Sequence, residues 1–315
     1  MPGLVGNETT VTRGGRVFPL SLGPGECGLK RLIITADDYG ASLPVNEAIE
    51  TAHRNGILTA TCLMVAAPMA EDAVKRARKL PSLRVGLHLV VVRGRSVLAP
   101  ERIPDLVDET GHFDRNLLRA GVRYFFLPRV RHQLAAEIRA QFEAFQATGL
   151  NLDHVNCHNH MHMHPTVFRL IADIGPAFGL AAVRLPYEPG GGIFLAPWIA
   201  LMKRRLRRAG LRFNDFLFGI RNTGRMDAEA LRRTIAALPE GVSEILLHPA
   251  TGHWDDMEPE AAGFRFEDEF KALIDPTVRD AVAKAEDAKP IPNAWLARLG
   301  EGASFDGRSL RVEGE

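Results

Sequence analysis

The stretch RLIITADDYG, residues 31–40, opens an alternation of strands and helices that decides the fold. Its run of apolar and β-branched residues is typical of a buried strand, and two acids and a glycine end it. A predicted helix at 43–56, a strand at 57–66, a helix at 69–80 and a strand at 83–92 follow in turn. Such alternation favours parallel βαβ units.

The alternation resumes after a less regular insertion at about 93–127. An amphipathic helix is predicted at 131–148, because its apolar residues recur every three or four positions. Further strands are predicted at 151–157, 181–186 and 243–249. The sequence therefore predicts one α/β domain with a deformed TIM-like (β/α) barrel fold.

The expected barrel domain occupies residues 31–300, between a poorly ordered N-terminal extension at 1–30 and a C-terminal tail at 301–315. The extension lacks the charged start and long apolar core of a signal peptide. The longest apolar stretch is well short of the roughly 20 residues that a spanning helix needs. We therefore expect a cytoplasmic protein, with peripheral contact at the inner membrane surface left open.

The composition excludes some classes of function. A net charge of +1 gives no reason to expect nucleic acid as a partner. The three cysteines, Cys27, Cys62 and Cys157, show no CxxC spacing, which argues against a disulfide framework and fits a reducing compartment. The oligomeric state is not predicted by any of these features.

Ionisable residues lie at or near the ends of four predicted strands: Asp37 and Asp38 at the first, His88 within the third, His158 after the strand at 151–157, and His248 at the end of the last. Because the carboxyl ends of parallel strands share one face of an α/β fold, we expect these five residues to converge. One carboxylate and two imidazoles form a common ligand set for Zn²⁺ or another divalent ion. The pattern indicates a metal-dependent hydrolase.

The two adjacent acids suggest different roles. Neighbours in an extended strand point to opposite sides, so one of Asp37 and Asp38 would bind the metal while the other acts as a base. His248, across the pocket, would protonate a leaving amine. Simpler explanations stay open: the acids as a turn or helix cap, His88 as a core histidine, and His248 as a strand end.

The decapeptide NCHNHMHMHP, residues 156–165, holds four histidines at alternate positions. Such a cluster indicates metal binding, but ligands from other strands leave room for only one or two of them. We expect His158, nearest the strand end, to be the ligand. His160 and His162 are expected to support it or to face the substrate, and His164 to do no chemistry.

Several of these stretches resemble the YdjC-like carbohydrate deacetylase family: LIITADDYG, HRNGILTATCLMV, VGLHL, HVNCHNHMHMHP and LLHPA. The match runs in order from about residue 31 to 250. The stretches RVGLHLVVVRGRSVLAP and AVRLPYEP look closer still to the hopanoid-biosynthesis-associated deacetylases. The resemblance implies a deformed (β/α) barrel that hydrolyses an N-acetyl group from a sugar.

Carried over by position, the resemblance implies Asp37 as the base, Asp38, His88 and His158 as metal ligands, and His248 as the acid.

One departure concerns Asn156, which stands where many relatives carry aspartate. We expect it to orient a histidine or the substrate, and its neutrality leaves Mg²⁺ as an alternative to Zn²⁺. Arg184 is expected either to orient the sugar or acetyl group or to form a structural ion pair.

For the subgroup, the implied substrate is an N-acetylglucosaminyl hopanoid, a sugar on a polycyclic lipid. The segment 193–208 joins apolar residues to five basic residues in KRRLRR, which is typical of a peripheral membrane contact or of a barrel helix with a solvated basic end. Alternatives are a deacetylase of soluble chitooligosaccharides, another metal-dependent hydrolase, and a non-catalytic metal- or lipid-binding protein.

Overall fold

The computed structural model describes most of the chain between residues 30 and 285. The described residues are 11–13, 16–18, 30–190, 195–255, 257–285, 288–290, 303–305 and 310–312. The predicted extension at 1–30 and tail at 301–315 therefore lie largely outside them. In these two parts the structure describes two short antiparallel pairs, β1 (Val11–Arg13) with β2 (Arg16–Phe18) and β10 (Ala303–Phe305) with β11 (Leu310–Val312).

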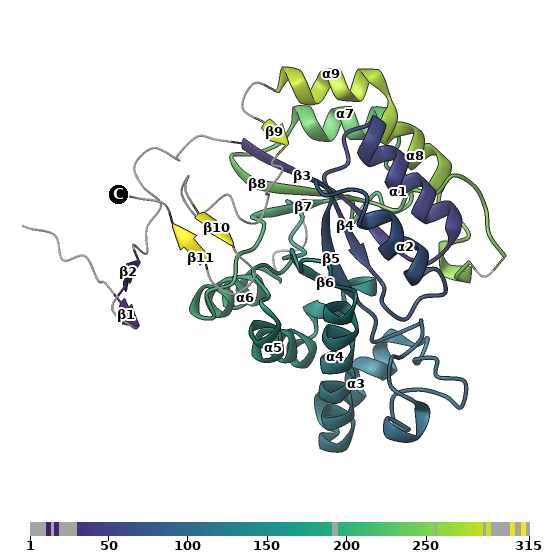
Figure 1. The fold of residues 1–315 in the computed structure, drawn as a ribbon, viewed down its shortest axis with the longest axis vertical. Helices are drawn as coiled ribbons and strands as arrows, with labels where there is room; N and C mark the ends of the chain where they lie inside the picture. Colours follow the sequence, from purple (N-terminus) through teal and green to yellow (C-terminus); the bar gives the residue numbers. More distant parts are fainter. Residues whose placement is uncertain are drawn as a thin grey trace, which may run out of the picture.

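Six parallel strands form the central curled sheet in the order β6-β5-β4-β3-β8-β7 (Figure 1). They are β3 (Lys30–Tyr39), β4 (Ala60–Leu63), β5 (Arg84–Leu89), β6 (Val155–Cys157), β7 (Phe216–Phe218) and β8 (Gly241–Leu247). A short strand, β9 (Ala288–Pro290), pairs in parallel with the start of β3. The parallel order confirms the βαβ units that the sequence predicts.

The two edge strands of the sheet are linked by a segment that is too irregular to count as a strand. Parallel bridges join Val155 of β6 to Val183, and Ala182 to Arg212 just before β7. The predicted strand at 181–186 therefore contributes only isolated bridges. The six strands form a curled half-barrel, which confirms the deformed barrel class.

Helices follow most of the strands. They are α1 (Leu43–Asn55), α2 (Ala70–Ala77), α3 (Leu117–Phe126), α4 (Pro128–Ala147), α5 (Pro165–Ile174), α6 (Ala196–Arg208), α7 (Ala228–Ala236), α8 (Phe266–Ile274) and α9 (Pro276–Lys284). Short 3₁₀ helices lie at Pro100–Arg102, His158–Met163, Gly175–Phe178 and Pro259–Ala261. Among the helices that the structure describes, none is both long enough and apolar enough to cross a membrane.

Local chemistry explains where these helices begin. The Ser42 side chain caps α1 by accepting a hydrogen bond from the Val45 backbone N–H, and Asp227 caps α7 in the same way from Ala230. Pro128 starts α4, because a proline at the first turn of a helix gives up no internal hydrogen bond. The predicted apolar stripe of α4 is buried, as expected: Leu134, Ile138, Phe142 and Phe145.

The strand β3 separates two packed regions. Leu32, Ile34 and Ala36 belong to the large core cluster, whereas Ile33 belongs to a small cluster with Ala182 and others. Successive side chains of a strand point to opposite faces, so Asp37 lies on the same face as Ile33.

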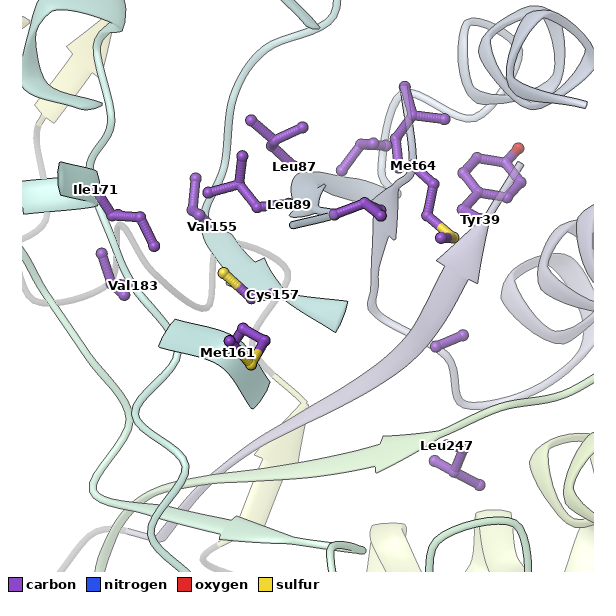
Figure 2. Packing of buried hydrophobic residues seen from close by; sticks show 14 of the residues in the cluster. Tyr39, Met64, Leu87, Leu89, Val155, Cys157, Met161, Ile171, Val183 and Leu247 are labelled. Atoms are coloured by element: carbon purple, nitrogen blue, oxygen red, sulfur yellow. The ribbon is translucent and has the colours of Figure 1, made fainter. Parts of the chain in front are cut away.

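The large cluster extends toward the carboxyl ends of the strands. Figure 2 shows Leu87, Leu89 and Val155 packed close together at β5 and β6, with Cys157 and Met161 beside them. The packing around the carboxyl ends of β5 and β6 is therefore dense, and it holds the groups that follow these strands in fixed positions.

The segment 193–208 forms mainly helix α6, although residues 193–194 lie outside the described part. Its apolar side chains Ile199, Met202 and Leu206 are buried in the core. Trp198 donates a hydrogen bond from Nε1 to the Met163 carbonyl at 3.0 Å. The structure thus favours the alternative that the sequence left open, a barrel helix with a solvated basic end.

Candidate metal centre

A bulge at the end of β3 places the two adjacent acids. The register of β3 against β4 shifts between Ala36 and Tyr39, so that Asp37 and Asp38 together oppose the single residue Cys62. Asp38 takes a left-handed backbone conformation with φ of 63°, which is uncommon outside glycine but which aspartate tolerates better than most residues. Such conformations gather at functional sites.

Because of the bulge, the two acids are not neighbours in a regular extended strand. Both carboxylates lie beside the same imidazole, that of His88. The Asp38 Oδ1 atom is 3.2 Å from the Nε2 atom of His88. One potential ligand atom from each of Asp37, Cys62 and His88 lies within 4.8 Å of the other two. The left-handed residue breaks the alternation on which the expectation rested.

Three atoms from three strand ends form a nearly regular triangle. The Asp38 Oδ1 atom is 3.2 Å from both His88 Nε2 and His158 Nδ1, and these two nitrogens are 3.4 Å apart. Ligands about 2.0–2.1 Å from a tetrahedral zinc ion lie roughly 3.3 Å from one another. The spacing and the N₂O donor set therefore fit a divalent metal.

Each imidazole of this triangle is fixed through its other nitrogen. The His88 Nδ1 atom lies 2.7 Å from Asn156 Oδ1, and the His158 Nε2 atom lies 3.3 Å from Glu258 Oε1. An oxygen acceptor on the far nitrogen holds the proton there and leaves the near nitrogen free to ligate. Glu258 lies in a loop one hundred residues from His158, and no sequence pattern marked it.

Asp38 and His158 each stabilise the charged form of the other. Burial raises the pKa of Asp38, but hydrogen bonds with His158 and His88 outweigh it and hold this pKa well below its usual value. Burial lowers the pKa of His158, but Asp38 and Glu258 outweigh it and raise this pKa to about 10. Surroundings that favour a proton also favour a metal cation, and the two compete for the same lone pair.

Asp37 is held from behind by a buried arginine. Arg184 donates from both terminal nitrogens to the two Asp37 oxygens, at 2.6 and 2.8 Å, and from Nε to Glu244 at 2.9 Å. Burial raises the pKa of Asp37, but Arg184 outweighs it and keeps this pKa well below its usual value. Arg184 is fully buried and does not line the pocket described below, so it forms a structural ion pair.

A second group of potential ligands, Asp37, Cys62 and His88, fits a metal poorly. Burial, with Asp37 next in effect, raises the pKa of the Cys62 thiol well above its usual value, so that it stays protonated. The Asp37 oxygens are held by Arg184, and the His88 Nδ1 atom is bonded to Asn156. Cys62 was not singled out as a site residue from the sequence, although it lies in the stretch HRNGILTATCLMV.

A pocket of about 420 Å³ opens above the triangle. Its lining includes Asp37, Asp38, His88, His158, His160 and His248, so four separate strand ends meet there. Much of the remaining lining is apolar, with Val45, Met64, Val90, Leu117, Trp254 and Phe264 among others. The arrangement can hold a cation beside a carboxylate and an imidazole, under an apolar wall.

The other predicted residues divide between the pocket and the core. The His248 ring lies 5.5 Å from that of Phe264, and its backbone N–H donates to Glu269. Burial lowers the pKa of His160 to about 3, which keeps this pocket histidine neutral. His162 is fully buried and, like Asn156, lies outside the pocket lining.

His164 has a structural role: its Nδ1 atom accepts a hydrogen bond from the Thr166 backbone N–H at the start of α5.

Comparisons with known proteins agree with one another. A family model described as YdjC-like protein matches residues 31–284. A carbohydrate deacetylase of Thermoanaerobacter pseudethanolicus is 28% identical over 70% of this chain and 82% of its own length. A carbohydrate deacetylase of Brevibacillus brevis is 36% identical over 50% of this chain and 60% of its own length.

One solved structure supports the fold. A protein of Enterococcus faecalis, described as a candidate cellobiose-phosphate cleavage protein, superposes with a TM-score of 0.69 at 23% identity. The superposition covers 85% of this chain and 99% of that protein.

Proposed function

Because this chain belongs to the YdjC-like protein family, we propose that it is a carbohydrate deacetylase that hydrolyses the N-acetyl group of an amino sugar with the help of a divalent metal. The observation that carries the proposal is the triangle of Asp38, His88 and His158, which line the pocket with ligand atoms 3.2–3.4 Å apart. Two nitrogens and one oxygen suit zinc best, with magnesium as the alternative.

A divalent ion held by these three residues would polarise the acetamide carbonyl and acidify a water molecule beside it. Asp37 faces the same pocket and is kept ionised by Arg184, so it can accept a proton as the water oxygen bonds to the acetamide carbon. A carboxylate with a low pKa takes a proton only from an acidified donor. The assignment of Asp37 as the base therefore depends on the metal.

The proton for the departing amine is assigned to His248. Its ring lines the pocket, and its Nδ1 atom has no hydrogen-bond partner among the described residues. As the C–N bond breaks, the amine nitrogen takes a proton from His248, and acetate is released. The proton that Asp37 took from the water then passes to the His248 imidazole, which restores both groups for the next cycle.

The apolar wall of the pocket supports a substrate that carries a lipid. Met64, Val90, Leu117 and Trp254 offer surface for an apolar group next to the sugar. We therefore propose an N-acetylglucosaminyl glycolipid of the hopanoid type in preference to a soluble chitooligosaccharide.

The test is acetate release and mass change on three substrates: an N-acetylglucosaminyl lipid, N,N′-diacetylchitobiose and a phosphate ester. We expect deacetylation of the lipid-linked sugar, weaker turnover of N,N′-diacetylchitobiose and no phosphate release. The double variant His88→Ala, His158→Ala should be inactive, and His132→Ala, an exposed histidine on α4, should keep full activity. If the double variant were as active as the wild type, the mechanism would not need a metal at this triangle. If phosphate were released, the proposed reaction would be phosphate-ester hydrolysis instead of deacetylation.

A further inference from the structure

Helix α3 exposes an apolar stripe to solvent. Leu118 is 78% exposed, Val122 50% and Phe126 67%, and Phe125 and Leu127 are also exposed. Four of these residues recur at helical spacing on one side of α3, and Leu127 directly follows the helix. Together they are five of the nine large exposed hydrophobic side chains in the part of the chain that the structure describes. We call these five residues the α3 face.

The α3 face is held in place by the opposite side of the helix. Ala120 and Tyr124 are buried, and the Tyr124 hydroxyl donates to the Val91 carbonyl. The rings of Phe125 and Phe126 pack edge to face with centroids 4.9 Å apart. The apolar stripe is thus presented by a fixed helix, beside α4 at one end of the molecule (Figure 1). A contiguous apolar stripe of this kind on a soluble fold marks a contact surface.

Within the segment that carries the α3 face, the charged side chains are all basic. The segment RNLLRAGVRYFFLPRVRH, residues 115–132, holds five arginines and no acid. Three of them pair with acids of neighbouring loops: Arg115 with Glu260, Arg119 with Asp114 and Arg129 with Asp105.

The two remaining arginines, Arg123 and Arg131, form no ion pair among the described residues. An exposed apolar helix face flanked by arginines complements the surface of an anionic bilayer, whose phosphates attract the cations while its acyl region accepts the apolar residues.

The first residue of the helix that carries the α3 face lies at the pocket. Leu117, the first residue of α3, lines the pocket, as do Arg93 and Arg95 of the same insertion. Glu260 of the opposite loop joins the two sides of the mouth through its ion pairs with Arg93 and Arg115. A bilayer that meets the α3 face would therefore lie beside the entrance to the proposed active site.

We propose that the α3 face docks the protein on the surface of an anionic membrane. Docking is a property of this surface and does not require the deacetylase activity. Its use in delivering a lipid-linked sugar from the bilayer to the pocket rests on the proposed function. The sequence suggested the segment 193–208 for this role, but its buried apolar side chains lie in the core. Its exposed basic side therefore serves as the control surface in the experiment.

The experiment is flotation of the full-length protein with vesicles of phosphatidylcholine alone and of phosphatidylcholine mixed with phosphatidylglycerol. We expect binding to the mixed vesicles and little to the neutral ones. Two double variants should each lower binding by about tenfold: one with Phe125→Ser and Phe126→Ser, the other with Arg123→Gln and Arg131→Gln. Removal of four exposed charges on α6, at Arg204, Arg205, Arg207 and Arg208, should leave it unchanged.

Two readouts separate this proposal from the proposed function. Turnover of a water-soluble N-acetylglucosamine substrate should be the same in the wild type and in both α3 variants, because no substituted residue lines the pocket. If the protein floats with the mixed vesicles but releases no acetate, only the deacetylase assignment is contradicted. Unchanged flotation of the α3 variants, or loss of flotation in the α6 variant only, would overturn the docking proposal. The proposal would also be overturned if the wild type bound no vesicles and formed a dimer that the α3 variants convert to monomer. The α3 face would then be a dimer interface.

Discussion

The Nδ1 atom of His88 lies 2.7 Å from the Oδ1 atom of Asn156. The Nδ2 atom of the same amide lies 3.2 Å from the carboxylate of Asp37. An ionised carboxylate can only accept, so the amide must turn its NH₂ group to Asp37 and its oxygen to His88. His88 then carries its proton on Nδ1, and the lone pair of Nε2 faces Asp38 and His158.

This relationship makes Asn156 the residue that selects the ligating form of His88. Asn156→Leu removes the acceptor for the His88 proton, and we expect metal affinity to fall by about 10–100-fold, measured by competition with a chelator. Asn156→Asp keeps an acceptor at that place and should retain most of the affinity. A leucine variant that binds metal as tightly as the wild type would show that the amide does not orient His88.

Glu258 should support His158 in the same manner. Glu258→Ala removes the acceptor 3.3 Å from the His158 Nε2 atom, so we expect about tenfold weaker metal binding by isothermal titration. Glu260→Ala is the matched control, because it lies on the same loop but pairs with Arg93 and Arg115 instead. Equal losses in the two variants would point to a general effect of the loop.

A variant of Cys62 tests which of the two groups of potential ligands holds the metal, because Cys62 belongs to only one of them. Cys62→Ala should keep the metal content of the wild type, because the thiol is held protonated by burial and by Asp37 and lies outside the triangle. Metal content per chain, measured by mass spectrometry of the purified protein, checks this. Loss of the metal in this variant would move the site to Asp37, Cys62 and His88.

The buried ion pair of Arg184 should matter for stability. Arg184→Met leaves Asp37 and Glu244 buried without their counter-ion, and we expect the free energy of unfolding in urea to fall by about 3–5 kcal/mol. Arg233→Met, which breaks an exposed pair with Glu229, should change it little. Similar stabilities of these two variants would contradict the structural role given to Arg184.

Much of the fold was predictable because it depends on local periodicity. The alternation after residue 31 gave parallel strands, and the stripe of α4 gave its buried side. The rule that strand ends share a face also anticipated that Asp37, His88, His158 and His248 line one pocket. Their chemical roles stay predictions.

Other features depend on contacts between distant segments, which periodicity does not encode. The bulge at Asp38 follows from its register against β4, and the ion-pair contact of Glu258 with His158 follows from the fold of a loop. Composition alone pointed to 193–208 as an apolar and basic surface. Whether such a helix turns its apolar side to the barrel or to solvent is decided by its neighbours, and the structure gives opposite answers for α6 and α3.

The central claim is that a metal held by Asp38, His88 and His158 enables deacetylation. The most direct measurement is acetate release from an N-acetylglucosaminyl lipid by chelator-treated protein during titration with Zn²⁺. We predict no release before metal is added, a rise that ends near one equivalent per chain, and no rise for the double variant His88→Ala, His158→Ala. Full acetate release by the metal-free protein, or recovery in the double variant, would contradict the claim.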